Sequence, residues 1–285
     1  MSVPTLRACI EDAEKRGVAI GHFNISNVEL LHGIYSAAKK LNVPVIIGVS
    51  ESEEVFLGLE EAVALVRTIR ERDQYPIYLN ADHHASFESV KRCIDAGFDM
   101  VIIDGAKLPF EENITLTKQC VAYARASGRD VLVEAEIGYI GSGSTIKDTI
   151  PEGAGIKTKP EEALRFVQET GIDLLAPSVG SIHGIIKSGK PHIDGDLIKQ
   201  IKELTHTPMV LHGGSGLRDE DFTNAIRAGV RIVHINSEIR LAYRDALRDT
   251  LASLPEEITP AKLCTPAITA VEAVVSARLQ LFNTP

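Results

Sequence analysis

The chain has 285 residues, of which 44% are hydrophobic and 24% charged, a balance typical of a folded protein with a substantial core. Its net charge of −9 disfavours non-specific binding to nucleic acid and to anionic membranes. No apolar run reaches the ~18 residues that suggest a membrane-spanning helix. Residues 1–17 have the pattern of an amphipathic helix and not of a signal peptide. We therefore expect a cytoplasmic protein without nucleic-acid or membrane partners, and its four widely spaced cysteines to be reduced.

Short β-branched runs alternate along the chain with segments of helical period. The predicted strands are residues 19–24, 43–50, 76–82, 99–104, 130–137, 173–180, 209–214 and 232–236. Ser26 and Glu29 predict a capping box at the start of the first intervening helix. Eight alternating strands and helices predict a (β/α)8 TIM barrel with an N-terminal helix and a C-terminal helical extension, as one domain over residues 1–285. An open doubly wound sheet is the less favoured alternative, because no GxGxxG follows the first strand.

Polar side chains gather at the ends of the predicted strands, where barrel enzymes place their catalytic groups. Asp82 and His83 end the third strand, and the fifth, sixth, seventh and eighth strands end near Glu134, Glu136, His183, His212, His234 and Asn236. Three histidines with an open fourth position form a common catalytic metal site. A single histidine is more often a hydrogen-bonded or surface residue, but three at equivalent strand ends indicate metal ligands. The histidines without that placement are interpreted as structural or exposed: His22, His32, His192 and His206.

Two further segments suggest phosphate binding. The run LHGGSGL places Gly213, Gly214 and Ser215 between the seventh strand and its helix, and Ser237 begins the helix after the eighth strand. Backbone N–H groups of these two loops commonly bind phosphate in barrels, although glycines also serve tight turns. The segment GSIHGIIKSGK adds Lys187, whose alternative explanation is a solvated charged loop.

The ordered motifs FNISN, NADHH, VEAEIG, GSIHG and LHGGSGL resemble those of the class II, metal-dependent fructose-bisphosphate and tagatose-bisphosphate aldolases, over about residues 21–247. The resemblance implies that Asp82 is the catalytic acid/base and that His83, His183 and His212 bind zinc. It also implies an alternative metal position at Glu136. The substrate or phosphate contacts that it implies are Asn24, Ser50, Gly184, Lys187, Gly213 and Ser215. Lys187 would lie near the phosphate or an associated monovalent cation.

The resemblance implies reversible cleavage of a phosphorylated ketose, first of all fructose 1,6-bisphosphate, to dihydroxyacetone phosphate and glyceraldehyde 3-phosphate. In this chemistry Asp82 takes the proton of the C4 hydroxyl and a Lewis-acidic metal stabilises the donor half. Three histidines do not distinguish Zn²⁺ from Co²⁺ or Mn²⁺. The small-molecule partner is then a sugar phosphate, and the family resemblance implies a homodimer or homotetramer.

Two positions depart from the family pattern. The loop after the fifth strand, residues 138–155, has Gly143 and Ser144 where relatives carry adjacent acids, and its nearest acids are Asp148 and Glu152. In the eighth strand, His234 aligns with a substrate-contacting asparagine, and Asn236 lies two residues later on the same face.

These departures keep two alternatives open. One is an aldolase for fructose 6-phosphate or another ketose phosphate with an unphosphorylated donor. The other is a non-catalytic protein that binds metal and sugar phosphate. The retained Asp82 argues against the second alternative, because binding alone needs no free carboxylate beside the metal.

Overall fold

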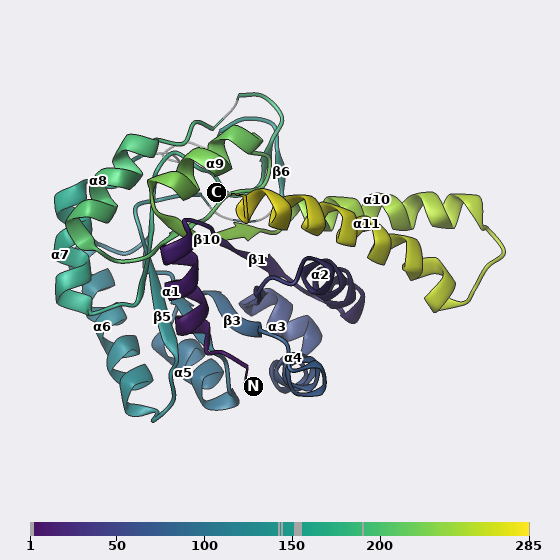
Figure 1. Ribbon diagram of the computed structural model, residues 1–285, viewed down its shortest axis with the longest axis horizontal. Helices are drawn as coiled ribbons and strands as arrows, with labels where there is room; N and C mark the ends of the chain where they lie inside the picture. Colours follow the sequence, from purple (N-terminus) through teal and green to yellow (C-terminus); the bar gives the residue numbers. More distant parts are fainter. Residues whose placement is uncertain (1–2, 142, 144, 151–155, 190, 285) are drawn as a thin grey trace.

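The structure, a computed structural model, describes residues 3–141, 143, 145–150, 156–189 and 191–284. Eight parallel strands close into a barrel in the order β1-β10-β9-β7-β5-β4-β3-β2 (Figure 1). The strands of the barrel are β1 (Ile20–Asn24), β2 (Val45–Ser50), β3 (Ile77–His84), β4 (Met100–Ile103), β5 (Leu132–Ile137), β7 (Leu174–Pro177), β9 (Met209–Leu211) and β10 (Val230–Ile235). This arrangement confirms the predicted (β/α)8 TIM barrel.

Helices surround the barrel, and one of them closes its N-terminal mouth. They are α1 (Leu6–Arg16), α2 (Val28–Leu41), α3 (Glu51–Leu57), α4 (Leu59–Asp73), α5 (Phe87–Ala96), α6 (Phe110–Ala126), α7 (Pro160–Thr170), α8 (Gly195–Thr205), α9 (Asp219–Ala228), α10 (Ser237–Ser253) and α11 (Pro260–Phe282). The apolar face of α1, with Leu6 and Ile10, packs against the strand residues that fill this mouth. The predicted N-terminal helix is thereby confirmed. Within the described residues, no helix is long and apolar enough to cross a membrane.

The barrel interior changes from apolar to polar along the strands. Near the N-terminal mouth it is filled by Ile20, Ile46, Tyr78, Met100, Leu132, Leu174, Val210 and Ile232. Because side chains of a strand alternate between its faces, every second residue onward also points inward. On β3 the inward-facing residues are Tyr78, Asn80 and Asp82 in that order, and on β5 Leu132 is followed by Glu134. The polar residues therefore lie toward the carboxyl ends of the strands.

Three local features differ from the sequence-based expectation. Asn27, not Ser26, is the N-cap of α2, and its side chain accepts a hydrogen bond from the backbone N–H of Leu30. Strand β3 continues beyond Asp82 to His84. Two short strands that the periodicity did not predict, β6 (Ile146–Lys147) and β8 (Ile185–Ile186), pair in parallel outside the barrel. They join the loop after β5 to the loop after β7.

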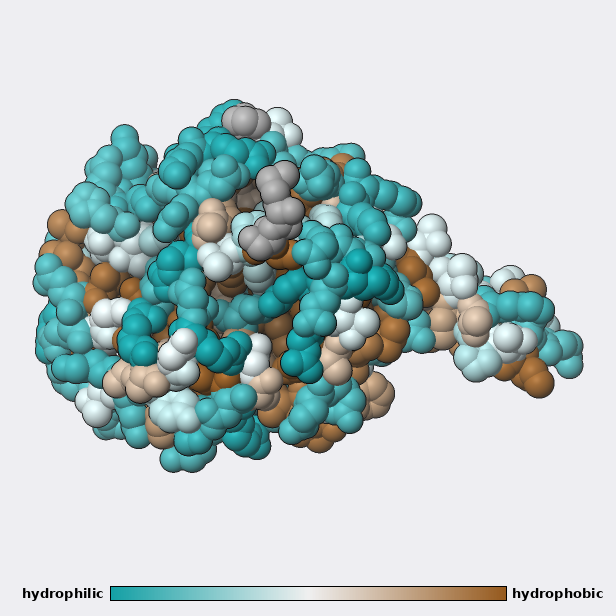
Figure 2. Space-filling view, turned by 60° about the horizontal axis from the view of Figure 1, so that its bottom comes forward, coloured by the Kyte–Doolittle hydropathy of each residue, from teal (hydrophilic) through white to brown (hydrophobic). Residues whose placement is uncertain are grey.

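The last two helices form an arm. Helices α10 and α11 pack against each other and extend away from the barrel, as Figures 1 and 2 show. The base of α11 returns to the barrel wall, where Val271, Val275 and Leu279 are buried. The predicted C-terminal helical extension thus belongs partly to the core and partly to a projection.

Candidate active site

Strand β3 is irregular where its three polar residues follow one another. His83 has a left-handed φ of 51°, and the pairing of β3 with β4 shifts register between Ala81 and His84. A positive φ is strained for a residue other than glycine, so the surrounding packing must hold it. The irregularity breaks the usual alternation, and both Asp82 and His83 line the same cavity of about 370 Å³. His84 is fully buried on the other side, beside Cys93.

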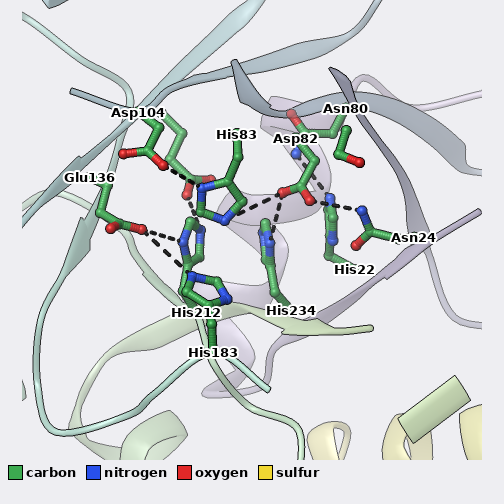
Figure 3. A network of polar contacts seen from close by, with 12 residues as sticks. His22, Asn24, Asn80, Asp82, His83, Asp104, Glu136, His183, His212 and His234 are labelled. Atoms are coloured by element: carbon green, nitrogen blue, oxygen red, sulfur yellow. Dashed lines mark hydrogen bonds and ion pairs between the residues drawn. The ribbon is translucent and has the colours of Figure 1, made fainter. Parts of the chain in front are cut away.

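The three predicted metal-ligand histidines converge beside Glu136 (Figure 3). The ring centroids of His83 and His183 lie 4.8 Å apart, and those of His83 and His212 lie 4.7 Å apart. The third pair, His183 and His212, is separated by 5.6 Å. Nitrogen atoms of these rings and an oxygen of Glu136 all lie within 4.8 Å of one another. The fold therefore brings together residues from four different strand ends.

Two glutamates hold the imidazole of His212. Glu136 Oε2 lies 2.8 Å from His212 Nδ1, and Glu134 Oε1 lies 2.7 Å from His212 Nε2. Burial alone would lower the pKa of His212, but these two carboxylates raise it well above its ordinary value. Glu136 Oε2 is also 3.9 Å from Nε2 of His183, a buried atom with no hydrogen-bond partner among the described residues.

These residues fit a divalent metal. Three imidazoles and a carboxylate are the donor types that zinc takes in proteins, and the unpartnered Nε2 of His183 faces the shared space. Asp104 accepts from the other side of the cluster, with Oδ2 2.9 Å from Nδ1 of His83. Such a carboxylate fixes the orientation of a ligating ring. The donor set does not select one metal among zinc, cobalt and manganese.

Asp82 lies between this cluster and β1. Its Oδ2 accepts a hydrogen bond of 2.8 Å from Asn24 Nδ2. Its Oδ1 lies 3.5 Å from His234 Nδ1 and 4.0 Å from His83 Nε2, and among the described residues it accepts no hydrogen bond. Burial would raise the pKa of Asp82, but the neighbouring histidines hold it well below its usual range. The side chain is therefore a carboxylate with one oxygen free to accept a proton.

A small cavity next to the histidines collects the residues predicted to bind phosphate. Its lining comprises Asn24, Asp82, His83, His183, Gly184, Gly213, Gly214, Ser215, His234, Asn236 and Ser237. A Cβ on Gly213 would lie 2.6 Å from the backbone of Ile182, and the φ of Gly213 is +63°. The loop after β9 therefore needs glycine at this position. Asn236 is the N-cap of α10, so the first N–H groups of that helix lie at the same cavity.

Two of the other predicted residues have different placements. Ser50 lines the larger cavity and caps α3, whose Glu53 accepts its hydroxyl at 2.8 Å. Lys187 lines neither cavity, and its ammonium contacts the exposed Asp148 at 2.9 Å. In the loop after β5, Ser144 and Glu152 lie outside the described residues. The described part of this loop contributes Tyr139, Gly141, Gly143 and Thr145 to the larger cavity.

Sequence reasoning missed three residues of this site. His22, assigned to structure or solvent, is fully buried with its ring stacked on His234. It precedes Asn24 by two positions on β1, and that shared strand face was the available signal. Asp104 follows β4 directly and had the same placement as the predicted residues. Glu53, which accepts from Asn24 at 2.9 Å, lies inside a helix and gave no such signal.

The fold and the polar residues at the carboxyl ends of its strands define the chain as a barrel enzyme. Comparisons with known proteins identify the family of this enzyme. A family model described as fructose-bisphosphate aldolase class-II matches residues 4–285. The chain is 38% identical to a fructose-bisphosphate aldolase of Geobacillus stearothermophilus over 99% of its length and 98% of that protein. A fructose-bisphosphate aldolase of Staphylococcus aureus (strain Mu50) is 37% identical over 100% of this chain and 98% of its own.

A solved structure gives the same result. The crystal structure of the YdjI aldolase from Escherichia coli K12 superposes with a TM-score of 0.84 at 28% identity, covering 99% of this chain and 97% of that one. The chain belongs to the class II fructose-bisphosphate aldolase family. It is therefore an aldolase, a carbon–carbon lyase of a metal-dependent family that acts on sugar phosphates.

Proposed function

We propose that the protein cleaves fructose 1,6-bisphosphate reversibly to dihydroxyacetone phosphate and glyceraldehyde 3-phosphate at the rim of the barrel. The observation that carries the proposal is the position of Asp82, a buried carboxylate with a free oxygen next to three converging histidines. A retro-aldol cleavage needs such a base close to a Lewis acid.

The catalytic roles follow from the contacts. His83, His183 and His212 would hold the metal, with Glu136 as an alternative ligand. The metal, zinc or else cobalt or manganese, supplies Lewis acidity toward the oxygens of the ketose.

Asp82 takes the proton of the C4 hydroxyl while the bond between C3 and C4 breaks and the aldehyde forms. The electron pair of that bond remains on the donor half, which takes up one proton at C3. This proton balances the one that Asp82 accepts and then releases to regenerate the base, so the cleavage is neutral in protons overall. Asn24 holds Asp82 in position through its hydrogen bond to Oδ2.

The two cavities accommodate the two ends of a bisphosphate. The smaller one offers backbone N–H groups of residues 213–215 and Ser237 to the phosphate of the donor. The larger one is lined by Lys107 and Arg240, whose charges suit the phosphate of the acceptor half. The smaller cavity favours the bisphosphate over fructose 6-phosphate, because fructose 6-phosphate has a phosphate only on its acceptor half and would leave the backbone N–H groups of this cavity without a ligand.

The cellular context follows from the same proposal. The four cysteines are free thiols, which suits the reducing cytoplasm where the sugar phosphates occur. We infer a homodimer or homotetramer, with the α10–α11 arm as the available contact surface.

The test is a panel of substrates with metal-loaded protein. We expect cleavage of fructose 1,6-bisphosphate to be more efficient, in kcat/KM, than that of tagatose 1,6-bisphosphate, fructose 6-phosphate and free fructose. A chelator should abolish the activity, and added zinc should restore it. Full activity in protein shown by elemental analysis to lack metal would refute the metal assignment, and a higher kcat/KM for fructose 6-phosphate would refute the substrate.

A further inference from the structure

Glu53 connects three elements beside the active site. It lies in α3 with only 4% of its surface exposed, and its carboxylate contacts residues of β1 and α10. Oε2 accepts hydrogen bonds of 2.9 Å from Asn24 Nδ2 and of 2.9 Å from the backbone N–H of Ser50. Oε1 forms an ion pair with the guanidinium of Arg240. A carboxylate buried this far requires such partners, because they replace the water that it has lost.

Helix capping explains only part of this arrangement. Ser50 is the N-cap of α3, and Glu53, three residues later, completes a capping box with it. A capping box joins the first residues of one helix to each other. The contacts of Glu53 with Asn24 and Arg240 come from other elements, so capping does not account for them. The contact with Asn24 leads directly to the proposed base.

The amide of Asn24 joins Glu53 to Asp82. Its Nδ2 donates to Glu53 Oε2 at 2.9 Å and to Asp82 Oδ2 at 2.8 Å, and Figure 3 shows the second contact. Both protons of the amide nitrogen are therefore engaged. Carboxylates can only accept, so the nitrogen of the amide and not its oxygen must face them. The orientation of Asn24 thus depends on an acceptor at each side of this nitrogen.

We propose that Glu53 is a positioning residue for the base, because it orients the Asn24 amide that holds Asp82. This inference rests on the aldolase function proposed above. The hydrogen bond from Asn24 fixes Oδ2 of Asp82 and leaves Oδ1, which accepts no hydrogen bond among the described residues, directed at the C4 hydroxyl of the ketose. A base that is displaced by about 1 Å can lose about 100-fold in rate.

The test replaces Glu53 by a side chain of similar length without an accepting oxygen. Glu53→Met leaves Asn24 with one acceptor in place of two, so its amide can turn away from Asp82. We expect kcat for fructose 1,6-bisphosphate cleavage to fall by about 10- to 100-fold. Metal content, measured by elemental analysis, should stay that of the wild type. The matched control is Glu71→Met, since Glu71 is exposed on α4, and it should cleave like the wild type.

A partial reaction separates the position of the base from general damage to the site. Metal-loaded protein is mixed with dihydroxyacetone phosphate in D2O, and NMR follows proton exchange at the carbon that becomes C3 of the ketose. Dihydroxyacetone phosphate has no C4 hydroxyl, so the exchange does not use the proposed role of Asp82. Glu53→Met should therefore retain the exchange rate while cleavage falls. Unchanged cleavage, or equal loss of both reactions in the folded variant, overturns the inference.

The coupling between Glu53 and Asn24 supplies a second measurement. Asn24→Ala should also lose cleavage and retain exchange. Addition of Glu53→Met to Asn24→Ala should lower cleavage no further, because residues that act through one contact are not additive. Additive losses overturn the inference. If Glu53→Met does not fold, Asn24→Ala decides alone: loss of cleavage with retained exchange supports the inference, and any other result overturns it.

A failure of the aldolase function gives a different result. In that case the wild-type protein itself does not cleave the bisphosphate, whereas a failure of the present inference leaves wild-type cleavage intact.

Discussion

Asp82 and His83 are neighbours in sequence, yet both side chains reach the same cavity because the backbone of His83 takes a left-handed conformation. A regular strand would have directed them to opposite faces. The strained residue is fixed by its surroundings, including the 2.9 Å contact between His83 Nδ1 and Asp104. Strain at this position places the proposed base next to the proposed metal ligand, a common use of unfavourable backbone geometry.

Replacement of Asp82 by asparagine tests the base directly. Asp82→Asn keeps the shape and the contact with Asn24 but removes the proton acceptor, so kcat should fall by about 100-fold or more. Metal content should remain that of the wild type, because the three histidines are intact. Elemental analysis and steady-state kinetics measure both quantities. The control is Asp196→Asn, since Asp196 is exposed on α8, and near-normal turnover of Asp82→Asn would contradict the assignment.

The element that shapes the donor cavity is the loop between β9 and α9. It passes so close to the loop after β7 that a Cβ on Gly213 would lie within 2.8 Å of three backbone atoms of Ile182. Backbone atoms cannot move aside as a flexible side chain can. The close approach brings the residues after His212 against those around His183, so the same contact aligns two proposed metal ligands.

Gly213→Ala should therefore damage the protein in two ways. The clash and the positive φ together should cost about 1–3 kcal/mol of stability, measured by urea denaturation. Displacement of the loop should raise KM for fructose 1,6-bisphosphate and also lower kcat, because the same contact aligns the two proposed metal ligands His183 and His212. Gly195→Ala is the matched control, because nothing lies within 4 Å of its Cβ and its φ is ordinary. Equal stability of the two variants would show that the loops are free to separate.

At the scale of the whole molecule, the arm formed by α10 and α11 projects beyond the wall of the barrel. The region around its turn carries the exposed apolar residues Leu251, Leu254 and Ile258. Figure 2 shows apolar surface near the end of the arm. Exposed apolar side chains on a projection are typical of a surface that packs against another chain. Arg240 on the barrel end of α10 binds Glu53 beside the active site, so the arm is anchored where the chemistry is proposed.

We predict that carboxylates introduced by substitution at the turn of the arm prevent self-association of the protein. Leu251→Asp combined with Ile258→Asp should convert an oligomer into monomers, because burying two unpaired carboxylates opposes the contact. Light scattering coupled to size-exclusion chromatography gives the mass of each form. Substitution of Asp at Leu204, which is exposed on α8 away from the arm, is the control. A wild-type protein that is monomeric at high concentration would exclude the inferred oligomer, and an oligomer unaffected by both changes would place the contact elsewhere.

The sequence by itself determined the barrel, the rim and most of the polar residues on it. Strands and helices differ in period, so their alternation was visible along the chain, and the ends of parallel strands must share one edge of the barrel. Tertiary structure alone decided that β3 is irregular at His83, because that backbone angle depends on neighbouring strands. It also decided that His22 stacks on His234 and that Lys187 lies outside both cavities. Local periodicity reports which face a residue occupies, whereas contacts between distant strands and loops arise only when the barrel closes.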